Sequence, residues 1–346
     1  MRDMIMRPEL VGQACGGYPL INFEVRDVRG KSRLIGIPNR PMRSLHRQLG
    51  KFLRGIIMHT DGSGYGLRKL PSAYGCVEGS NPLRNASQHK ENQYFYITDI
   101  SNAYGTVSLE RLALLLTYLI QYEAYEESGF SLAWFGQDER VWVLRQDEAY
   151  QPVLGLLVAH FGGLHGQGLA IGGPLSPYLM NLYCEVYIDA PLRKFCEPRE
   201  ITYTRYVDDL TFSAKHFIGE ETRRRIRAVI SRGGFTLNRQ KSRAQMLSMG
   251  QVSITQIGLA RDTPDGSTRL VFSQKKRRKL HGIIHSYLTR GMDWPEKVRG
   301  YAAEFLYYYK NVAVRTATDE KTFELCKRFE REWKLYGGPK HRTRSK

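Results

Sequence analysis

The stretch Thr204–Phe212, TRYVDDLTF, decides the fold, because two adjacent acids interrupt a run of aromatic and β-branched residues. Runs of this kind on both sides of a short interruption predict a β-hairpin over Tyr203–Ser213. Burying Asp208 and Asp209 side by side costs free energy unless a cation neutralises them. A hairpin tip that presents both acids to Mg²⁺ meets that requirement, since Mg²⁺ prefers carboxylate and phosphate oxygens. The alternative for this stretch alone is a solvent-exposed Asp-Asp turn without a function.

A second apolar run also ends in an acid. Tyr94–Ile100 reads YFYITDI, a β-rich pattern whose charged residue is Asp99. Two strands can bring three acids into one cleft, enough to hold two metal ions about 3.5–4 Å apart. Such a pair of ions activates a primer hydroxyl and stabilises the leaving pyrophosphate. The two acidic strands together therefore point to nucleotidyl transfer.

The charge of the chain favours a nucleic-acid partner. The 346 residues carry a formal net charge of +18, and 42% of them are hydrophobic, enough for a substantial core. A positive charge of this size attracts polyanions, because each neutralised phosphate releases condensed counterions. Residues 273–346 hold 19 Lys and Arg against 8 Asp and Glu, a net +11, interleaved with tyrosines. The alternatives are a basic protein with no such partner and one that lies on an anionic membrane.

The cysteines and the apolar runs bear on the cell compartment. The five cysteines are Cys15, Cys76, Cys184, Cys196 and Cys326. Their odd number, with no pair at metal-ligand spacing, favours a reducing compartment without disulfides or a zinc site. The segment MRDMIMRPEL has no signal-peptide pattern, and no apolar run approaches a membrane span. We expect a cytoplasmic protein with no membrane partner.

The remaining periodicity predicts a mixed fold. Arg33–Pro38 alternates and ends in proline, which indicates a strand that runs into a turn. Met42–Leu53 and Leu109–Tyr122 have helical spacing, and the pattern is helical from Lys275 onward. In the Phe305–Tyr309 cluster we expect at least half of the side chains in the core. Strands that carry acids, packed helices and a basic helical tail predict an α+β core with an appended α-helical domain.

Several motif blocks resemble a reverse transcriptase of the bacterial retron type, in the order in which that family has them. The blocks are Lys31–Leu49 (fingers), Tyr96–Val107 (motif A), Gly168–Tyr183 (motif B), Tyr203–Ala214 (motif C), Gly234–Ser242 (motif D) and Gln256–Asp262 (near the primer grip). The resemblance implies a right-hand polymerase, in which an antiparallel palm sheet carries the catalytic aspartates. It implies an N-terminal segment with fingers at 1–98, a palm with interleaved fingers elements at 99–272, and a basic helical thumb and tail at 273–346.

The resemblance also assigns the catalytic centre. Asp99 and Asp208 correspond to the principal metal ligands and catalytic acids, and Asp209 to the third acid. The backbone carbonyl of Ile100 corresponds to a further ligand. The implied cofactor is Mg²⁺, as two ions, with Mn²⁺ as the alternative.

The implied nucleotide site surrounds these acids. Lys31 and Arg33 would bind the triphosphate of a dNTP, Arg33 as a bidentate fork. Tyr104 would lie beneath the sugar and exclude a 2′-hydroxyl, although a core aromatic is the alternative. Lys241 matches the motif D lysine that donates a proton to pyrophosphate, and a plain surface lysine explains it nearly as well.

Motif B departs from the family at Ala170-Ile171-Gly172, where the usual wording is Pro-Gln-Gly. The family glutamine contacts the nucleotide, and Ile171 cannot form that hydrogen bond. Gly172 retains the backbone approach to nucleotide and template. The departure puts ordinary substrate handling in question.

The retron subtype rests on Asn85-Ala86-Ser87-Gln88-His89, which matches an NAxxH element. It implies a structured non-coding RNA as template and primer, an RNA–DNA heteroduplex as product, and a possible effector protein of an anti-phage defence system. The expected RNA-binding residues are Asn85, His89, Lys275, Lys276, Arg277, Arg278 and Lys279.

Other departures, such as Gln256-Ile257-Gly258 for Val-Thr-Gly, leave a non-retron defence reverse transcriptase with atypical template or primer use as an alternative. An RNA-dependent RNA polymerase, protein-primed or template-independent synthesis by the same site, and a non-catalytic RNA-binding assembly protein on a polymerase fold are further alternatives.

Overall fold

The computed structural model describes residues 21–27, 32–58, 70–121, 143–261, 266–290 and 295–335. The chain divides into two compact units, each of which contains two segments. The first unit comprises Met1–Asn81 and Tyr96–Ala244, and the second comprises Pro82–Phe95 and Gln245–Lys346. Helices and sheets occur in both units, so the predicted α+β class is confirmed. Lys31, Cys15 and Asp262 lie outside the described residues.

A four-stranded sheet forms the centre of the first unit. Its strand order is β4 (Thr202–Tyr206), β5 (Asp209–Ala214), β3 (Tyr94–Asp99) and β6 (Arg243–Met246). β4 and β5 are antiparallel and pair from Thr202 with Ser213 to Tyr206 with Asp209. The hairpin predicted from TRYVDDLTF is therefore confirmed, and β3, the other acidic strand, lies directly beside β5.

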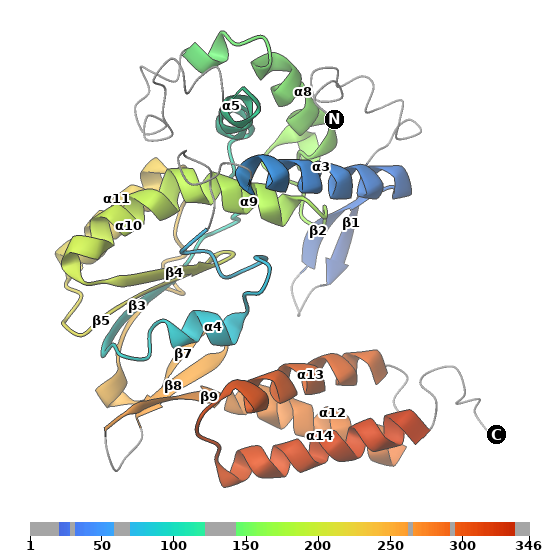
Figure 1. The fold of residues 1–346 in the computed structure, drawn as a ribbon, viewed down its shortest axis with the longest axis vertical. Helices are drawn as coiled ribbons and strands as arrows, with labels where there is room; N and C mark the ends of the chain where they lie inside the picture. The colour runs from blue at the N-terminus through green and yellow to red at the C-terminus, as the bar shows by residue number, and fades with distance from the viewer. Residues whose placement is uncertain are drawn as a thin grey trace. The chain divides into compact units, whose positions relative to one another are not determined.

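The first unit also contains several α-helices. They are α3 (Arg40–Met58), α5 (Leu109–Ile120), α8 (Tyr150–His160), α9 (Ser176–Cys184), α10 (Ala190–Cys196) and α11 (Glu220–Arg232). Helices α9, α10 and α11 run along one side of the sheet (Figure 1). α5 begins where Ser108 Oγ accepts a hydrogen bond from the Arg111 backbone N–H, and its leucine-rich sequence is almost entirely buried. The helices predicted over 42–53 and 109–122 are thus confirmed, within a few residues.

A separate two-stranded hairpin belongs to the same unit. β1 (Ile21–Asp27) and β2 (Ser32–Pro38) are antiparallel, and β2 matches the strand expected at Arg33–Pro38. Gly36 in β2 donates its backbone N–H to the carbonyl of Ile171 at 2.7 Å. This bond joins the hairpin to the loop that precedes α9.

The second unit combines a small sheet with three long helices. It contains α4 (Pro82–Ser87), the strands β7 (Val252–Ile254), β8 (Ile257–Arg261) and β9 (Thr268–Phe272), and the helices α12 (Gln274–Arg290), α13 (Pro295–Asn311) and α14 (Ala317–Leu335). The helical pattern expected from Lys275 onward is confirmed. In the aromatic cluster Phe305 and Tyr308 are buried and Tyr307 is exposed, as the expected partial burial requires.

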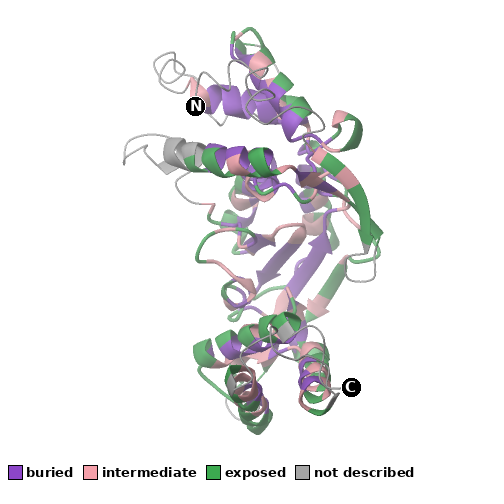
Figure 2. Ribbon diagram, turned by 90° about the vertical axis from the view of Figure 1, so that its right-hand side faces the viewer, coloured by how far each residue is buried: buried purple, intermediate pink, exposed green. Residues whose placement is uncertain are grey.

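Burial is concentrated in the strands of the central sheet and in the inner faces of the helices (Figure 2). The four cysteines in the described part of the chain are all free thiols. Among the described helices, none combines the length and the apolar character that crossing a membrane requires. The mixed helix-and-sheet architecture is consistent with a polymerase fold.

Candidate active site

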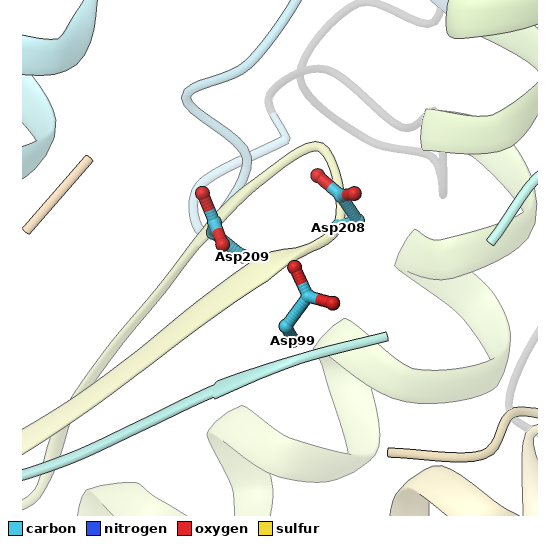
Figure 3. A group of neighbouring side chains, drawn as sticks. All are labelled: Asp99, Asp208 and Asp209. Carbon is cyan, nitrogen blue, oxygen red and sulfur yellow. The ribbon is translucent and has the colours of Figure 1, made fainter. Parts of the chain in front are cut away.

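Three carboxylates meet where β3 ends and where β4 turns into β5. Asp99 is the last residue of β3, Asp208 lies in the turn, and Asp209 opens β5. One oxygen from each carboxylate lies within 4.8 Å of the others (Figure 3). The Ile100 backbone N–H donates to the Asp208 carbonyl at 2.8 Å, which fixes the end of β3 against the turn. The structure therefore brings together the three acids that the sequence pattern predicted.

The acid cluster is electrostatically strained. Burial raises the pKa of Asp209 from 3.8 to about 7, with further contributions from the charges of Asp208 and Asp99. Burial and the neighbouring charge of Asp99 also raise the pKa of Asp208. Oxygen-only donors with raised pKa values are the chemistry of a site for a hard divalent cation. The three aspartates therefore fit such a cation, and the carbonyl of Ile100 follows directly in the chain.

One cation of the protein itself already lies against the cluster. Lys241 Nζ is 2.7 Å from Asp99 Oδ2, and its side chain is 47% exposed. The positive charge of Arg33, an exposed residue of β2, lowers the pKa of Asp208 and so faces the same acids. Two cationic side chains therefore lie near the acid cluster.

Backbone and hydroxyl contacts hold the segment of Lys241 beside β3. The Asn238 N–H donates to the Asp99 carbonyl at 2.8 Å, and the Ser101 N–H donates to the Thr236 carbonyl at 2.8 Å. The hydroxyls of Thr98 and Ser242 are 2.7 Å apart. These contacts explain why Lys241 reaches Asp99 although the two residues are far apart in sequence.

The turn that carries Asp208 is strained. Val207 has φ +60°, a left-handed conformation that is costly for a β-branched residue. Arg205 Nη1 donates to the Val207 carbonyl at 3.1 Å and so supports the turn from inside the protein. The position of Asp208 therefore depends on Arg205.

Arg205 is itself held by a buried ion pair. Its guanidinium contacts both oxygens of Asp189, with the closest nitrogen at 2.7 Å, and neither side chain is exposed. Tyr203 donates to Asp189 at 2.7 Å, and Arg205 Nη1 also donates to Asn181 Oδ1 at 2.9 Å. The sequence reading missed this network. An arginine inside a predicted buried strand was the available signal, because a buried arginine requires a partner.

Gly75 lies directly against the turn that carries Asp208. A Cβ added there would be 2.5 Å from both the backbone N and Cγ2 of Val207. Asn181 Nδ2 donates to the Gly75 carbonyl at 3.0 Å, so the same asparagine contacts Gly75 and Arg205. The sequence alone gave no reason to select this glycine.

Gly75→Ala is expected to displace the turn, since the new methyl group overlaps backbone atoms. We expect a loss of about 1–3 kcal/mol in the free energy of unfolding and a fall of about 10- to 100-fold in activity. Gly282→Ala is the control, because no described atom lies within 4 Å of its added Cβ. Urea denaturation and nucleotide incorporation measure the two effects, and equal behaviour of the two variants would contradict the close approach.

The loop before α9 contacts the segment after Asp99. The Leu169 N–H donates to the Tyr104 carbonyl at 2.8 Å. Gly168 has φ +60°, and a Cβ there would be 2.5 Å from the Gly105 carbonyl oxygen. Burial and the charges of Cys76 and Asp208 raise the pKa of Tyr104, whose ring is partly buried. Tyr104 therefore lies within electrostatic range of Asp208, and its role at the sugar stays a prediction.

Gly172 and Ile171 lie in the same loop. Gly172 has φ +107°, and a Cβ there would be 2.6 Å from the Gly36 carbonyl oxygen, so only glycine fits. Ile171 uses its backbone carbonyl to bind Gly36, and its side chain is partly exposed. The structure thus explains Gly172 by its contact with β2.

The RNA-binding residues expected in the second unit separate into two groups. Asn85 and His89 are only 1% and 0% exposed, and burial lowers the pKa of His89 to about 3. Asn85 Nδ2 donates to Thr255 Oγ1 at 3.3 Å. This burial argues against the predicted RNA contacts of the two side chains, which instead stabilise the unit internally.

The basic run at the start of α12 is likewise divided. Lys276 forms an ion pair with Glu304, and Arg277 pairs with the buried Asp319 at 2.7 Å. These two side chains hold α12 against the other helices and are not available for RNA in this conformation. The other three members of the run are exposed: Lys275, Arg278 and Lys279.

The metal-free protein is expected to lose stability as the pH rises from about 4 to about 7 through the titration of Asp209. A carboxyl whose folded-state pKa is raised retains its proton in the folded state over this window, so its ionisation favours unfolding. The test is the difference in urea stability between the parent and Asp209→Asn in EDTA across this range. Added Mg²⁺ should reduce the loss, because it binds the ionised cluster. A pH-independent difference would contradict the raised pKa.

The chain is similar in sequence to two curated bacterial proteins. No protein-family model matches the chain. The chain is 28% identical over 272 residues to the Retron Mx65 reverse transcriptase of Myxococcus xanthus, which covers 77% of this chain and 55% of that protein. It is 26% identical over 184 residues to the Retron Ec83 reverse transcriptase of Escherichia coli, which covers 52% of this chain and 48% of that protein. The chain thus spans about half the length of these curated relatives.

Solved structures give weaker similarity. The telomerase of Candida tropicalis in complex with a TWJ fragment of telomeric RNA matches with a TM-score of 0.48 and 13% identity, over 91% of this chain and 54% of that chain. The corresponding telomerase of Candida albicans matches with a TM-score of 0.47 and 11% identity, over 90% and 59%. TM-scores of this size do not establish a shared fold. The relationship therefore rests on the sequence comparisons. Over much of its length, and at modest identity, this chain is a relative of proteins named retron reverse transcriptases.

Proposed function

We propose that the chain is an RNA-directed DNA polymerase that copies a dedicated, structured non-coding RNA into DNA. The observation that carries the proposal is the convergence of Asp99, Asp208 and Asp209 within 4.8 Å, at the ends of neighbouring strands. The curated relatives are named reverse transcriptases, which supports the same reaction. The proposed substrates are dNTPs, and the product is an RNA–DNA heteroduplex.

Asp99, Asp208 and Asp209 would hold two Mg²⁺ ions, with the Ile100 carbonyl as a further ligand. When bound, the ions lower the pKa of the primer hydroxyl and neutralise charge on the leaving pyrophosphate. The chain supplies the geometry, because the Ile100 N–H bond to the Asp208 carbonyl and the Arg205 bond to the Val207 carbonyl fix the acids before substrate binds.

Two cationic side chains would interact with the triphosphate of the incoming nucleotide. Arg33 lies on β2 and acts on the charge of Asp208, and it would bind phosphate oxygens as a fork. Lys241 pairs with Asp99, and it would move to the pyrophosphate when a cation takes its place. Lys241 would then be within reach to donate a proton to the leaving group.

Tyr104 would select the sugar of the incoming nucleotide. Removal of the ring in Tyr104→Ala should raise rNTP incorporation relative to dNTP incorporation by about 100-fold, since the ring no longer clashes with the 2′-hydroxyl. Tyr104→Phe is the control and should retain the discrimination, because it keeps the ring. Single-nucleotide incorporation on an RNA template measures the ratio, and an unchanged ratio in Tyr104→Ala would assign the ring to packing alone.

Primer extension tests the reaction itself. The full chain is given an RNA template with a DNA primer, with dNTPs or rNTPs, in Mg²⁺, Mn²⁺ or EDTA. We expect metal-dependent extension with dNTPs. Extension with rNTPs alone would indicate an RNA-dependent RNA polymerase, and absence of extension under all conditions would favour an RNA-binding assembly protein.

The dedicated template is tested by the nucleic acid that copurifies with the protein from its native locus. We propose a retron-type system, with an effector protein for anti-phage defence, because both curated relatives are named retron enzymes. A discrete small RNA joined to its DNA copy is the expected cargo of the parent protein, and RNA alone is expected with Asp208→Asn. DNA copied from varied RNAs would instead support a non-retron enzyme with atypical template use, to which Ile171 also points.

A further inference from the structure

A basic groove lies outside the acid cluster in the first unit, between α11 and the segment that leads into β6. Its volume is about 590 Å³. Four arginines line it: Arg223 and Arg227 from α11, Arg239 from the loop before β6, and Arg243 from β6. Glu220 is the one acidic residue in this lining. Four guanidinium groups against one carboxylate leave three positive charges in excess.

The one carboxylate among the described lining residues is shared between two of the arginines. Glu220 pairs with Arg223 at 3.2 Å and also with Arg227. The Nε of Arg223 is buried and has no hydrogen-bond partner in the part of the chain that the structure describes. Leaving a buried N–H without an acceptor is unfavourable, so a phosphate oxygen that reaches this group would stabilise it.

The lining favours phosphate over a base. Tyr96 and Phe235, the aromatic residues of the groove, are 3% and 2% exposed, so neither ring offers a face for base stacking. The charged donors of the lining are guanidiniums, which bind phosphate oxygens through paired N–H donors. Recognition in this groove is therefore recognition of a phosphate group without base readout.

The spacing of the arginines suits a polymer. Arg223 and Arg227 are one helical turn apart, about 6 Å along the axis of α11, and the other two arginines come from β6 and from the loop before it. Cations spread over two elements can contact successive phosphates of one strand, whereas a single small anion would use only some of them. We propose that this groove binds the phosphodiester backbone of an RNA strand outside the catalytic site, independently of base sequence.

The test uses two charge-matched variants of α11 in the full chain. Arg223→Gln/Arg227→Gln removes two positive charges from the groove. Arg224→Gln/Arg225→Gln removes two from the same helix outside it, where both arginines pair with Glu221 and are largely exposed. The probe is a fluorescein-labelled single-stranded RNA of random sequence. Its affinity is measured at constant pH over a salt range of about 50 to 500 mM.

We expect the groove variant to lose about 10- to 30-fold in RNA affinity at moderate salt, and its log–log salt slope to fall by about 1.4, since single-stranded binding loses about 0.7 per phosphate contact. The control variant should stay within about twofold. Equal losses in both variants would overturn the proposal, because they would show a diffuse surface effect. Binding of tripolyphosphate that is as tight as that of RNA, and that is lost only in the groove variant, would overturn the assignment to a polymer.

Primer extension on a short hybrid separates this site from the proposed polymerase. Both double variants should extend it at the parental rate, because neither pair of arginines contacts the acid cluster. If the groove variant binds RNA more weakly but no protein extends the primer, the proposed RNA-binding groove is kept and the proposed polymerase activity is rejected. Loss of extension in the groove variant alone, on this short hybrid, would place the arginines in the catalytic cleft and overturn the proposal.

Discussion

Asp208→Asn is expected to abolish DNA synthesis, with a loss of at least about 1,000-fold, because the substitution removes one charged ligand from the metal cluster. The same change removes a like charge from a cluster in which burial and repulsion already raise the pKa of Asp209 to about 7. The metal-free variant should therefore be as stable as the parent or more stable. Primer extension and thermal denaturation, each with and without Mg²⁺, measure the two effects.

The combination of lost activity and retained stability distinguishes a catalytic acid from a structural one. Mg²⁺ should stabilise the parent more than Asp208→Asn, since the ion binds the folded state of the parent more tightly. Glu91→Gln is the control for loss of one negative charge, because Glu91 is 75% exposed on its side chain and lies in the second unit. Retention of more than about a tenth of the activity by Asp208→Asn would refute the assigned role.

The second large effect is expected at the buried pair of Arg205 and Asp189. Arg205→Met leaves Asp189 buried without its cation, and it also removes the hydrogen bond to the Val207 carbonyl. We expect a loss of about 3–5 kcal/mol in the free energy of unfolding, the usual cost of breaking a fully buried ion pair. Activity should fall as well, since the strained turn that carries Asp208 loses its support.

A double-mutant cycle separates the ion pair from the positioning of the turn. Arg205→Met/Asp189→Asn should be less destabilised than the sum of the single variants by roughly 1–3 kcal/mol, because no buried charge is left alone. Its activity should nevertheless stay low, because the bond to Val207 is still missing. Recovery of kcat together with stability would show that Arg205 acts only through folding. Additive losses of stability would contradict the pairing itself.

The acidic strands could be predicted from sequence because their signals are local. Alternating apolar residues around Asp208 and Asp209, and the run that ends in Asp99, specify strands by the two-residue period of a pleated chain. The order of the motif blocks then indicated that the strands share one site. The structure confirms the hairpin and the placement of β3 beside β5.

The prediction of RNA-binding residues was partly wrong because the local sequence does not show which polar side chains are buried or paired. Asn85, His89, Lys276 and Arg277 are polar, and a sequence pattern favours placing such residues on the surface. The structure buries the first two and pairs the others with Glu304 and Asp319, which lie on later helices. Whether a charged side chain is available depends on partners brought from elsewhere in the chain, and no local pattern records them.

The sequence by itself therefore determined the strand and helix pattern, the three acids and the positive charge, because each follows from neighbouring residues or from composition. Tertiary structure alone decided how the acids are held. It pairs Arg205 with Asp189 across 16 positions, places Gly75 against Val207, and gathers four arginines from α11, from β6 and from the loop before β6 into one groove. These features arise from close packing between distant segments, where a contact exists only once the chain has folded.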